Sequence, residues 1–217
     1  REAARAADEA GRHIIHMEVG QPGTPAPKGA RDGLAAAMQT GQLGYTVALG
    51  LPELRARIAR LYADWYGVDL DPARVVITPG SSGGFILAFT ALFDGGEKVA
   101  IGAPGYPSYR QILRALDLEP VVVQTSQSAR LQPTPADLGD VDFQGLMVAS
   151  PANPSGTMLG KPELAALIKC AQDRGAAFIS DEIYHGIEYE AKAVSALEIS
   201  DDVYVINSFS KYFSMTG

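Results

Sequence analysis

From residue 75 onward, short apolar runs alternate with longer segments whose apolar residues recur at helical spacing. The apolar runs are continuous, and they cover residues 75–78, 98–101, 121–124, 146–149, 177–180 and 203–206. A strand that is apolar on both faces is typical of a parallel sheet with helices on both sides. Helices are predicted between the strands, over residues 85–93, 106–116 and 162–174. The sequence therefore predicts an α/β fold with a mostly parallel sheet and helices on both faces.

The first 74 residues do not show this alternation of apolar runs and helical segments. Residues 1–11 are rich in alanine and charged residues, and they predict a helix that ends at Gly11; a second helix is predicted over residues 28–38. A third helix is predicted to begin at Pro52, because proline suits the first helical position, and to end at Gly67.

Composition and charge limit the partners and the compartment. The net charge of −7 argues against a partner that needs a basic surface, such as a nucleic acid or an anionic membrane. The longest apolar stretch, Phe85–Phe93, is too short to span a bilayer. The single cysteine, Cys170, cannot form an internal disulfide and is expected to be a small core residue. Without a visible signal peptide, we expect a cytoplasmic protein.

Candidate functional residues follow the predicted strands. Ligands of open parallel sheets bind beyond the carboxyl ends of the strands. Gly80–Gly84 is predicted to be a turn before a helix, where backbone N–H groups and two hydroxyls suit an anion such as phosphate. Tyr106 could stack on a planar ring, and Asn153 lies in a loop with two prolines and a glycine, from which its amide can donate to an oxyanion.

Two charged residues also follow strands. Asp181 ends a buried strand, so its carboxylate needs a cationic or hydrogen-bond-donating partner; an arginine or a protonated ring nitrogen would serve. Lys211 follows the last strand among small hydroxyl residues. Burial would lower the pKa of its amine and leave free amine to attack a carbonyl.

Together and in this order, these residues resemble one family, the pyridoxal-phosphate enzymes with the aspartate-aminotransferase fold, class I/II aminotransferases. The resemblance covers nearly the whole chain and rests on Gly44–Tyr45, Gly50–Arg55, Pro79–Gly84, Pro104–Tyr106, Ser150–Gly156, Asp181–Tyr184 and Ser208–Gly217. It implies the PLP-dependent transferase fold. Residues 1–44 would be an N-terminal arm and part of the small domain, and residues 45–217 the cofactor-binding large domain.

The resemblance also implies roles at the matching positions. Lys211 would bind pyridoxal 5'-phosphate as a Schiff base and shuttle a proton, and Asp181 would keep the ring nitrogen protonated. The resemblance further implies that Asn153 and Tyr184 bind the ring oxygen of the cofactor and that Tyr106 stacks on the ring face. The phosphate would be bound by Ser81, Ser82 and Ser208. Tyr45 would reach the phosphate of a neighbouring subunit, which implies a homodimer with shared sites. Gly20, with Asn153, would lie near the substrate carboxylate.

The implied reaction moves an amino group between an α-amino acid and a 2-oxo acid. Another reaction on the same fold (C–S lyase, decarboxylase or synthase) is an alternative, because the cofactor does the electronic work. A second alternative is a fragment that binds cofactor without turnover. The chain begins without methionine and stops at Gly217, before the arginines that family members use for phosphate and substrate carboxylate. We therefore expect a fragment, with an incomplete large domain and most of the small domain missing.

Two other kinds of site are disfavoured. Gly80-x-Ser82-x-Gly84 fits the nucleophile elbow of hydrolases, but the downstream His185 lies near the wrong strand end for a triad. His13 and His16 have metal-ligand spacing without an evident third ligand, so no metal site is predicted.

Overall fold

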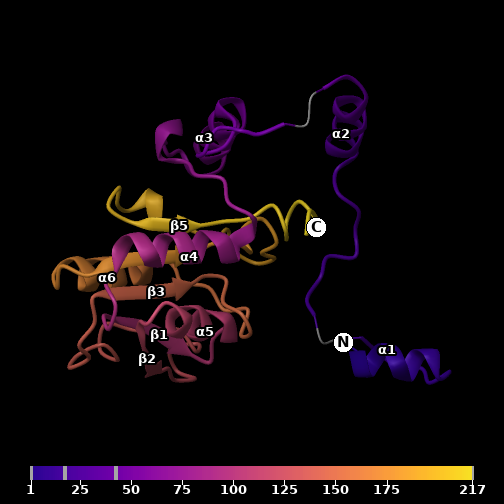
Figure 1. The fold of residues 1–217 in the computed structure, drawn as a ribbon. Helices are drawn as coiled ribbons and strands as arrows, with labels where there is room; N and C mark the ends of the chain where they lie inside the picture. Colours follow the sequence, from indigo (N-terminus) through magenta and orange to yellow (C-terminus); the bar gives the residue numbers. More distant parts are fainter. Residues whose placement is uncertain (1, 17–18, 42–43, 217) are drawn as a thin grey trace.

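The computed structural model describes residues 2–16, 19–41 and 44–216 (Figure 1). Its centre is a five-stranded sheet in the order β2-β1-β3-β4-β5. The strands are β1 (Lys98–Ala103), β2 (Glu119–Gln124), β3 (Gly145–Ala149), β4 (Ala177–Asp181) and β5 (Tyr204–Ile206). All four neighbouring pairs are parallel. The predicted α/β architecture is confirmed.

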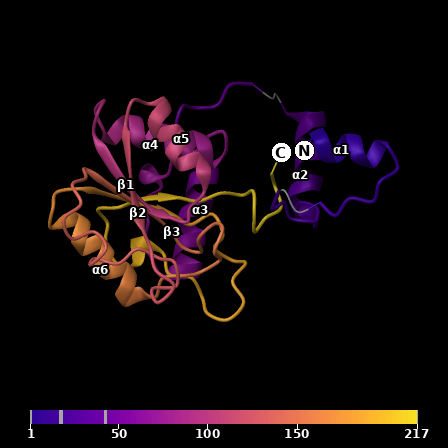
Figure 2. The same cartoon turned by 90° about the horizontal axis from the view of Figure 1, so that it is seen from below.

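Helices cover both faces of this sheet (Figure 2). Those against the sheet are α4 (Gly80–Leu92) and α5 (Pro107–Ala115) on one face and α6 (Lys161–Gln172) on the other. The described residues also form α1 (Glu2–Glu9), α2 (Lys28–Thr40) and α3 (Pro52–Tyr66), with short 3₁₀ turns at Pro72–Arg74 and Ala196–Glu198. Val99 and Met147 pack with α4 and α5, whereas Leu146 and Val148 pack with α6. Consecutive strand residues thus enter opposite cores, which explains why the strands are apolar throughout. Cys170 is free, half-buried and packed against the α6 core, as predicted.

A proline and a glycine set the two ends of α3. Pro52 occupies the first turn, where a missing N–H costs nothing. Gly67 caps the carboxyl end with φ +69, a left-handed conformation that glycine adopts readily. Both predicted ends of this helix are confirmed.

Two local predictions before β1 were wrong. The segment Val75–Thr78 is not a strand, although Val75 has an extended backbone (φ −92, ψ 128). A strand needs a neighbouring ladder. Here the N–H of Ile77 donates instead to the carbonyl of Leu49, at 3.0 Å. Gly80–Gly84 is also not a separate turn, because it forms the first turn of α4.

The N-terminal arm, which we define as residues 2–16 and 19–41, lies outside the two cores. Neither α1 nor α2 has a buried residue, and Leu34 and Met38 on α2 are 59% and 62% exposed. Figure 1 shows both helices joined to the rest of the chain by extended segments. Over the described residues, no helix combines the length and apolar character needed to cross a membrane.

Candidate active site

The predicted site residues lie at one edge of the sheet, where the parallel strands end. Tyr106 follows β1, Asn153 follows β3, Asp181 is the last residue of β4, and Lys211 follows β5. In Figure 1 the orange segment after β3 and the yellow segment after β5 extend from the same edge of the sheet. This edge is where ligands of open parallel sheets bind.

Asp181 is buried at this edge, with 3% of its surface exposed. The hydroxyl of Tyr109 donates to its Oδ2, and the N–H of Ile183 donates to its Oδ1 at 3.1 Å. Within the described ranges, no lysine, arginine or histidine forms an ion pair with Asp181. Burial therefore raises the pKa of its carboxyl to about 6, against the lowering effect of these two donors. The arginine partner considered from sequence is absent there, and the site suits a cation from a ligand.

Lys211 lies beside residues from two other segments. Its Nζ donates to the carbonyl of Gly20 at 2.9 Å and lies 5.7 Å from the centroid of the Tyr184 ring. The Nδ2 of Asn153 donates to the Tyr184 hydroxyl at 3.4 Å. The structure thus brings together four residues that the sequence spreads over almost 200 positions.

Tyr109, which donates to Asp181, contacts a second aromatic ring. The rings of Tyr106 and Tyr109 meet nearly edge to face, with centroids 5.5 Å apart. Tyr106 is 41% exposed, so part of its ring is open to contact with a ligand. Sequence reasoning missed Tyr109, because it reads as one more apolar position of α5. The available indication was its spacing from Tyr106, since residues i and i+3 near a helix start can face the same site.

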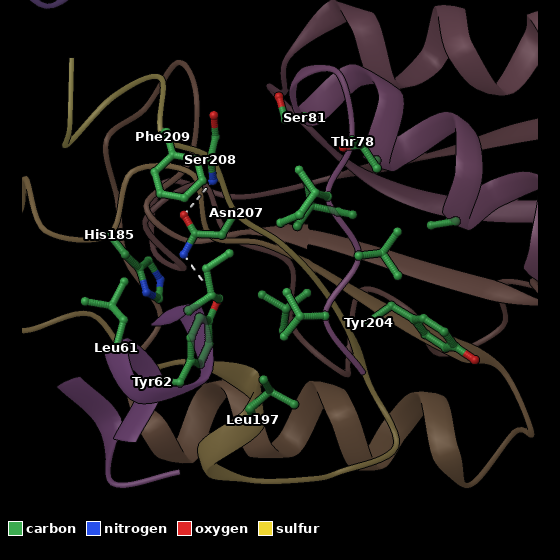
Figure 3. Close-up of a pocket in the computed structure, with 18 of the residues that line it drawn as sticks. Leu61, Tyr62, Thr78, Ser81, His185, Leu197, Tyr204, Asn207, Ser208 and Phe209 are labelled. Carbon is green, nitrogen blue, oxygen red and sulfur yellow. Dashed lines mark hydrogen bonds between the residues drawn. The ribbon is translucent and has the colours of Figure 1, made fainter. Parts of the chain in front are cut away.

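Ser81 and Ser208 line one cleft of about 590 Å³ between α3, α4 and β5 (Figure 3). The hydroxyl of Ser208 donates to that of Ser210 at 2.8 Å. Asn207 accepts from the N–H of Ser208 at 2.7 Å and donates to the Tyr62 hydroxyl at 3.3 Å, which anchors the segment after β5 to α3.

The start of α4 lies close to this segment. A Cβ on Gly84 would come within 3.3 Å of the Ile206 side chain, so glycine allows the helix to approach β5. No side chain caps the helix in the described part of the chain. The helix start therefore keeps N–H groups and a partial positive charge for an anion.

Two predicted residues do not join this group. Ser82 is exposed and is not part of the cleft lining. Tyr45 is fully exposed, and its role toward a neighbouring subunit stays a prediction. Gly217, the last residue of the Ser208–Gly217 motif, lies outside the described residues.

The arrangement does not support the hydrolase alternative. His185 is buried, its Nε2–H donates to the carbonyl of Ser150 at 2.9 Å, and its Nδ1 accepts from the Tyr66 hydroxyl at 2.7 Å. Burial lowers the pKa of this imidazole. With both nitrogens engaged, His185 cannot take a proton from Ser82. Among the described residues, no three His, Cys, Asp or Glu side chains form a group that could hold a metal ion.

Glu182, beside Asp181, is a buried carboxyl group without a predicted role. Its side chain is fully buried, and its Oε1 accepts from Ser180 and from the N–H of Ala196. Its Oε2 lies 3.7 Å from Nδ1 of His185 and has no hydrogen-bond partner among the described residues. Burial raises the pKa of Glu182 to about 7.

This raised pKa predicts that the ionisation of Glu182 lowers the stability of the folded protein as the pH rises. The folded protein favours protonated Glu182, so its stabilising contribution is complete below pH 4.5 and is lost as the pH rises through about 7. From pH 4.5 to about 7, we expect the free energy of unfolding of Glu182→Gln to rise by ~3 kcal/mol relative to that of the original protein. Urea unfolding of the cofactor-free proteins at pH 4.5 and 7.5 measures the change, and comparison at each pH separates it from the titration of His185. Glu190→Gln, at an exposed site, should show no such trend. An equal difference at both pH values would contradict the prediction.

Comparison with known proteins relates this site to a family. The family of class I and II aminotransferases matches residues 12–217. A valine–pyruvate aminotransferase of Mycobacterium tuberculosis is 47% identical over 208 residues, which cover 94% of this chain and 54% of that protein. A solved aminotransferase structure from Mycobacterium tuberculosis has 45% identity and a TM-score of 0.96, and the match covers 100% of this chain and 57% of that one. A solved structure from Silicibacter pomeroyi, of a protein assigned as an aminotransferase, has 69% identity and a TM-score of 0.92, with 100% and 56% covered. The chain therefore spans little more than half the length of these proteins.

Proposed function

Since this chain belongs to the family of class I and II aminotransferases, we propose that it is the cofactor-binding part of an enzyme that transfers an amino group from an α-amino acid to a 2-oxo acid. The cofactor would be pyridoxal 5'-phosphate. The observation that supports this most strongly is Asp181, a buried carboxylate with no cationic partner in the described residues, at the same sheet edge as Lys211.

The residues present fit this cofactor. Its ring nitrogen is a base that becomes a cation on protonation, and Asp181 is buried with no cationic side chain paired to it in the part of the chain that the structure describes. Its phosphate is an anion, and the uncapped start of α4 with Ser81 and Ser208 offers backbone and hydroxyl donors. Its ring oxygen needs donors, and the Asn153 amide and the Tyr184 hydroxyl adjoin each other. The Tyr106 ring is open for stacking.

When bound, the cofactor supplies an electron sink for the charge left when the substrate Cα loses its proton. Lys211 would bind the cofactor through its amine and, after displacement by the substrate, move the proton at Cα. Asp181 would hold a proton on the ring nitrogen, and Tyr109 would keep its carboxylate oriented. Ser81, Ser208 and the start of α4 would fix the phosphate.

Substrates and assembly complete the proposal. The substrates would be an α-amino acid and a 2-oxo acid, with Gly20 and Asn153 near the substrate carboxylate. A homodimer would place Tyr45 at the phosphate of the neighbouring subunit, which accounts for a tyrosine with 109% relative exposure in a single chain. The cytoplasm is the proposed compartment.

Borohydride reduction tests the proposal directly. We expect incubation with pyridoxal 5'-phosphate, reduction and peptide mapping to give one phosphopyridoxyl group, on Lys211. The intact mass would also report the length of the parent chain. Adducts spread over several surface lysines, or none on a folded chain, would overturn the assignment.

A further inference from the structure

The loop that bears Asn153, residues 150–159 and here called the Asn153 loop, has few anchors of its own. Within it, the N–H of Ala152 donates to the carbonyl of Thr157, and the N–H of Gly156 donates to the carbonyl of Ala152. Leu159 N–H donates to the Ser150 hydroxyl at 2.9 Å. The Asn153 side chain makes a long hydrogen bond of 3.4 Å to Tyr184. The three backbone N–H contacts shape the loop from within. Its backbone is tied to other segments by the N–H of Ser150, which donates to the carbonyl of Asp181 at 3.1 Å, by Arg130, which donates to the carbonyl of Met158 at 3.2 Å, and by two buried side chains.

A buried glutamine ties both ends of the Asn153 loop to a neighbouring segment. Gln132 is 3% exposed and lies after β2. Its Nε2 donates to the carbonyl of Ala149 at 3.2 Å and to the carbonyl of Thr157 at 2.9 Å. One amide group therefore joins the residue just before the loop to a residue near the loop's end.

The backbone before Gln132 is specialised. Arg130 and Leu131 have φ values of +54° and +58°, in the left-handed region that side chains other than glycine rarely adopt. Two such residues in succession cost free energy, and they persist only where surrounding contacts determine them. This turn leads into Gln132, whose side chain is buried against the Asn153 loop.

A second buried donor approaches the loop from another side. His185, in the turn after β4, is 2% exposed and donates from Nε2 to the carbonyl of Ser150 at 2.9 Å. Because a carbonyl can only accept, the Ser150 carbonyl requires the proton on Nε2, and Nδ1 then accepts from the Tyr66 hydroxyl. Gln132 and His185 thus hold three carbonyls at the two ends of the loop, those of Ala149, Ser150 and Thr157.

We propose that Gln132 and His185 are positioning residues, which hold the Asn153 loop so that the Asn153 amide meets the ring oxygen of the cofactor. The proposal rests on the proposed function for its purpose, and on the hydrogen bonds above for its geometry. A buried donor that loses its acceptor costs more than an exposed one, so the loop has a strong preference for this arrangement.

Hydrogen exchange of the cofactor-free protein tests the anchoring. Gln132→Met keeps the size of the side chain and removes both donors. We expect the amides of Ala152, Gly156 and Leu159 to exchange roughly tenfold faster, because local opening no longer breaks these bonds. The amides of β3 and β4 should be unchanged. Gln172→Met is the matched control, since it removes an amide hydrogen bond to Ser200 on the surface of α6. Unchanged loop amides, or equal acceleration throughout the sheet, would overturn the anchoring.

The link to Asn153 is tested by the absorbance of the Lys211-bound cofactor, which changes with protonation. Loss of the Asn153 amide removes a donor to the ring oxygen. In Asn153→Ala, the pH at the midpoint of this absorbance change should therefore be roughly one unit higher. Gln132→Met and His185→Leu should move it in the same direction, and His185→Gln, which keeps a donor, should restore it. In the Asn153→Ala background, Gln132→Met should add nothing.

An added shift in the double variant would show that Gln132 does not act through Asn153, and would overturn the positioning role. Failure of the original protein to bind the cofactor would overturn the proposed function and the purpose assigned to the two residues. The exchange experiment would still decide whether they anchor the loop, so the two failures can be told apart.

Discussion

Lys211→Ala is expected to abolish amino-group transfer, with a loss on the order of 10³–10⁴-fold or more, because the variant lacks both the amine that binds the cofactor and the base that moves the Cα proton. The position of Lys211 supports this expectation. It follows β5 at the site edge, with Nζ next to Gly20 and the Tyr184 ring. Single-turnover transfer from an amino acid, followed by absorbance, measures the loss.

Lys169→Ala is the matched control for this experiment. Lys169 lies on α6 and pairs with Asp173 on the surface, so its loss should leave the transfer rate unchanged. Full activity of Lys211→Ala would remove the basis of the proposed function. Equal losses in both variants would mean that the assay reports damage to the fold and not chemistry.

Asp181→Asn is expected to reduce transfer by on the order of 10²–10³-fold, since a neutral amide cannot hold a proton on the ring nitrogen and a buried charge partner is lost. Attachment to Lys211 should persist, because it needs the amine and not the carboxylate. Reduction with borohydride and the transfer rate, measured on the same sample, separate the two effects.

The same substitution should change how the stability of the cofactor-free protein depends on pH. The folded pKa of Asp181 is raised from 3.8 to about 6, so its stabilising contribution, complete below pH 3.8, is lost as the pH rises through 6. Between pH 3.8 and pH 8, the free energy of unfolding of the asparagine variant should therefore rise by ~3 kcal/mol relative to that of the original protein. Asp142→Asn, on the surface beside Lys98, should change neither quantity appreciably. A stability difference that is the same at low pH and at pH 8 would contradict this account of the site.

The sheet was predictable because a strand that is buried on both faces is apolar at successive positions, and this pattern is visible in the sequence. Leu146 and Met147 enter different cores, so both had to be apolar. The segment Val75–Thr78 has the same composition but was mispredicted. Composition reports a preference for extended backbone, whereas a strand requires a neighbour to pair with.

The candidate site was predictable only in part. Asp181 and Lys211 could be recognised in the sequence, because a charged side chain at the end of an apolar strand is costly to bury without a partner. Tyr109 and Gln132 do not stand out, since a tyrosine in an amphipathic helix and a glutamine in a loop are ordinary. Their importance lies in contacts with Asp181 and with the carbonyls of Ala149 and Thr157, which are 72 and up to 25 positions away along the chain. No local pattern records such pairings.

The exposed arm has a consequence for proteolysis. Arg12, Lys28 and Arg31 are exposed trypsin sites in a segment whose helices have no buried residue, so trypsin should cleave there before it reaches the sheet. The trimmed protein would keep both cores and the contact of Tyr109 with Asp181. It would lose Gly20, whose carbonyl holds the amine of Lys211. A protease could thus separate the stability of this protein from the placement of its reactive amine.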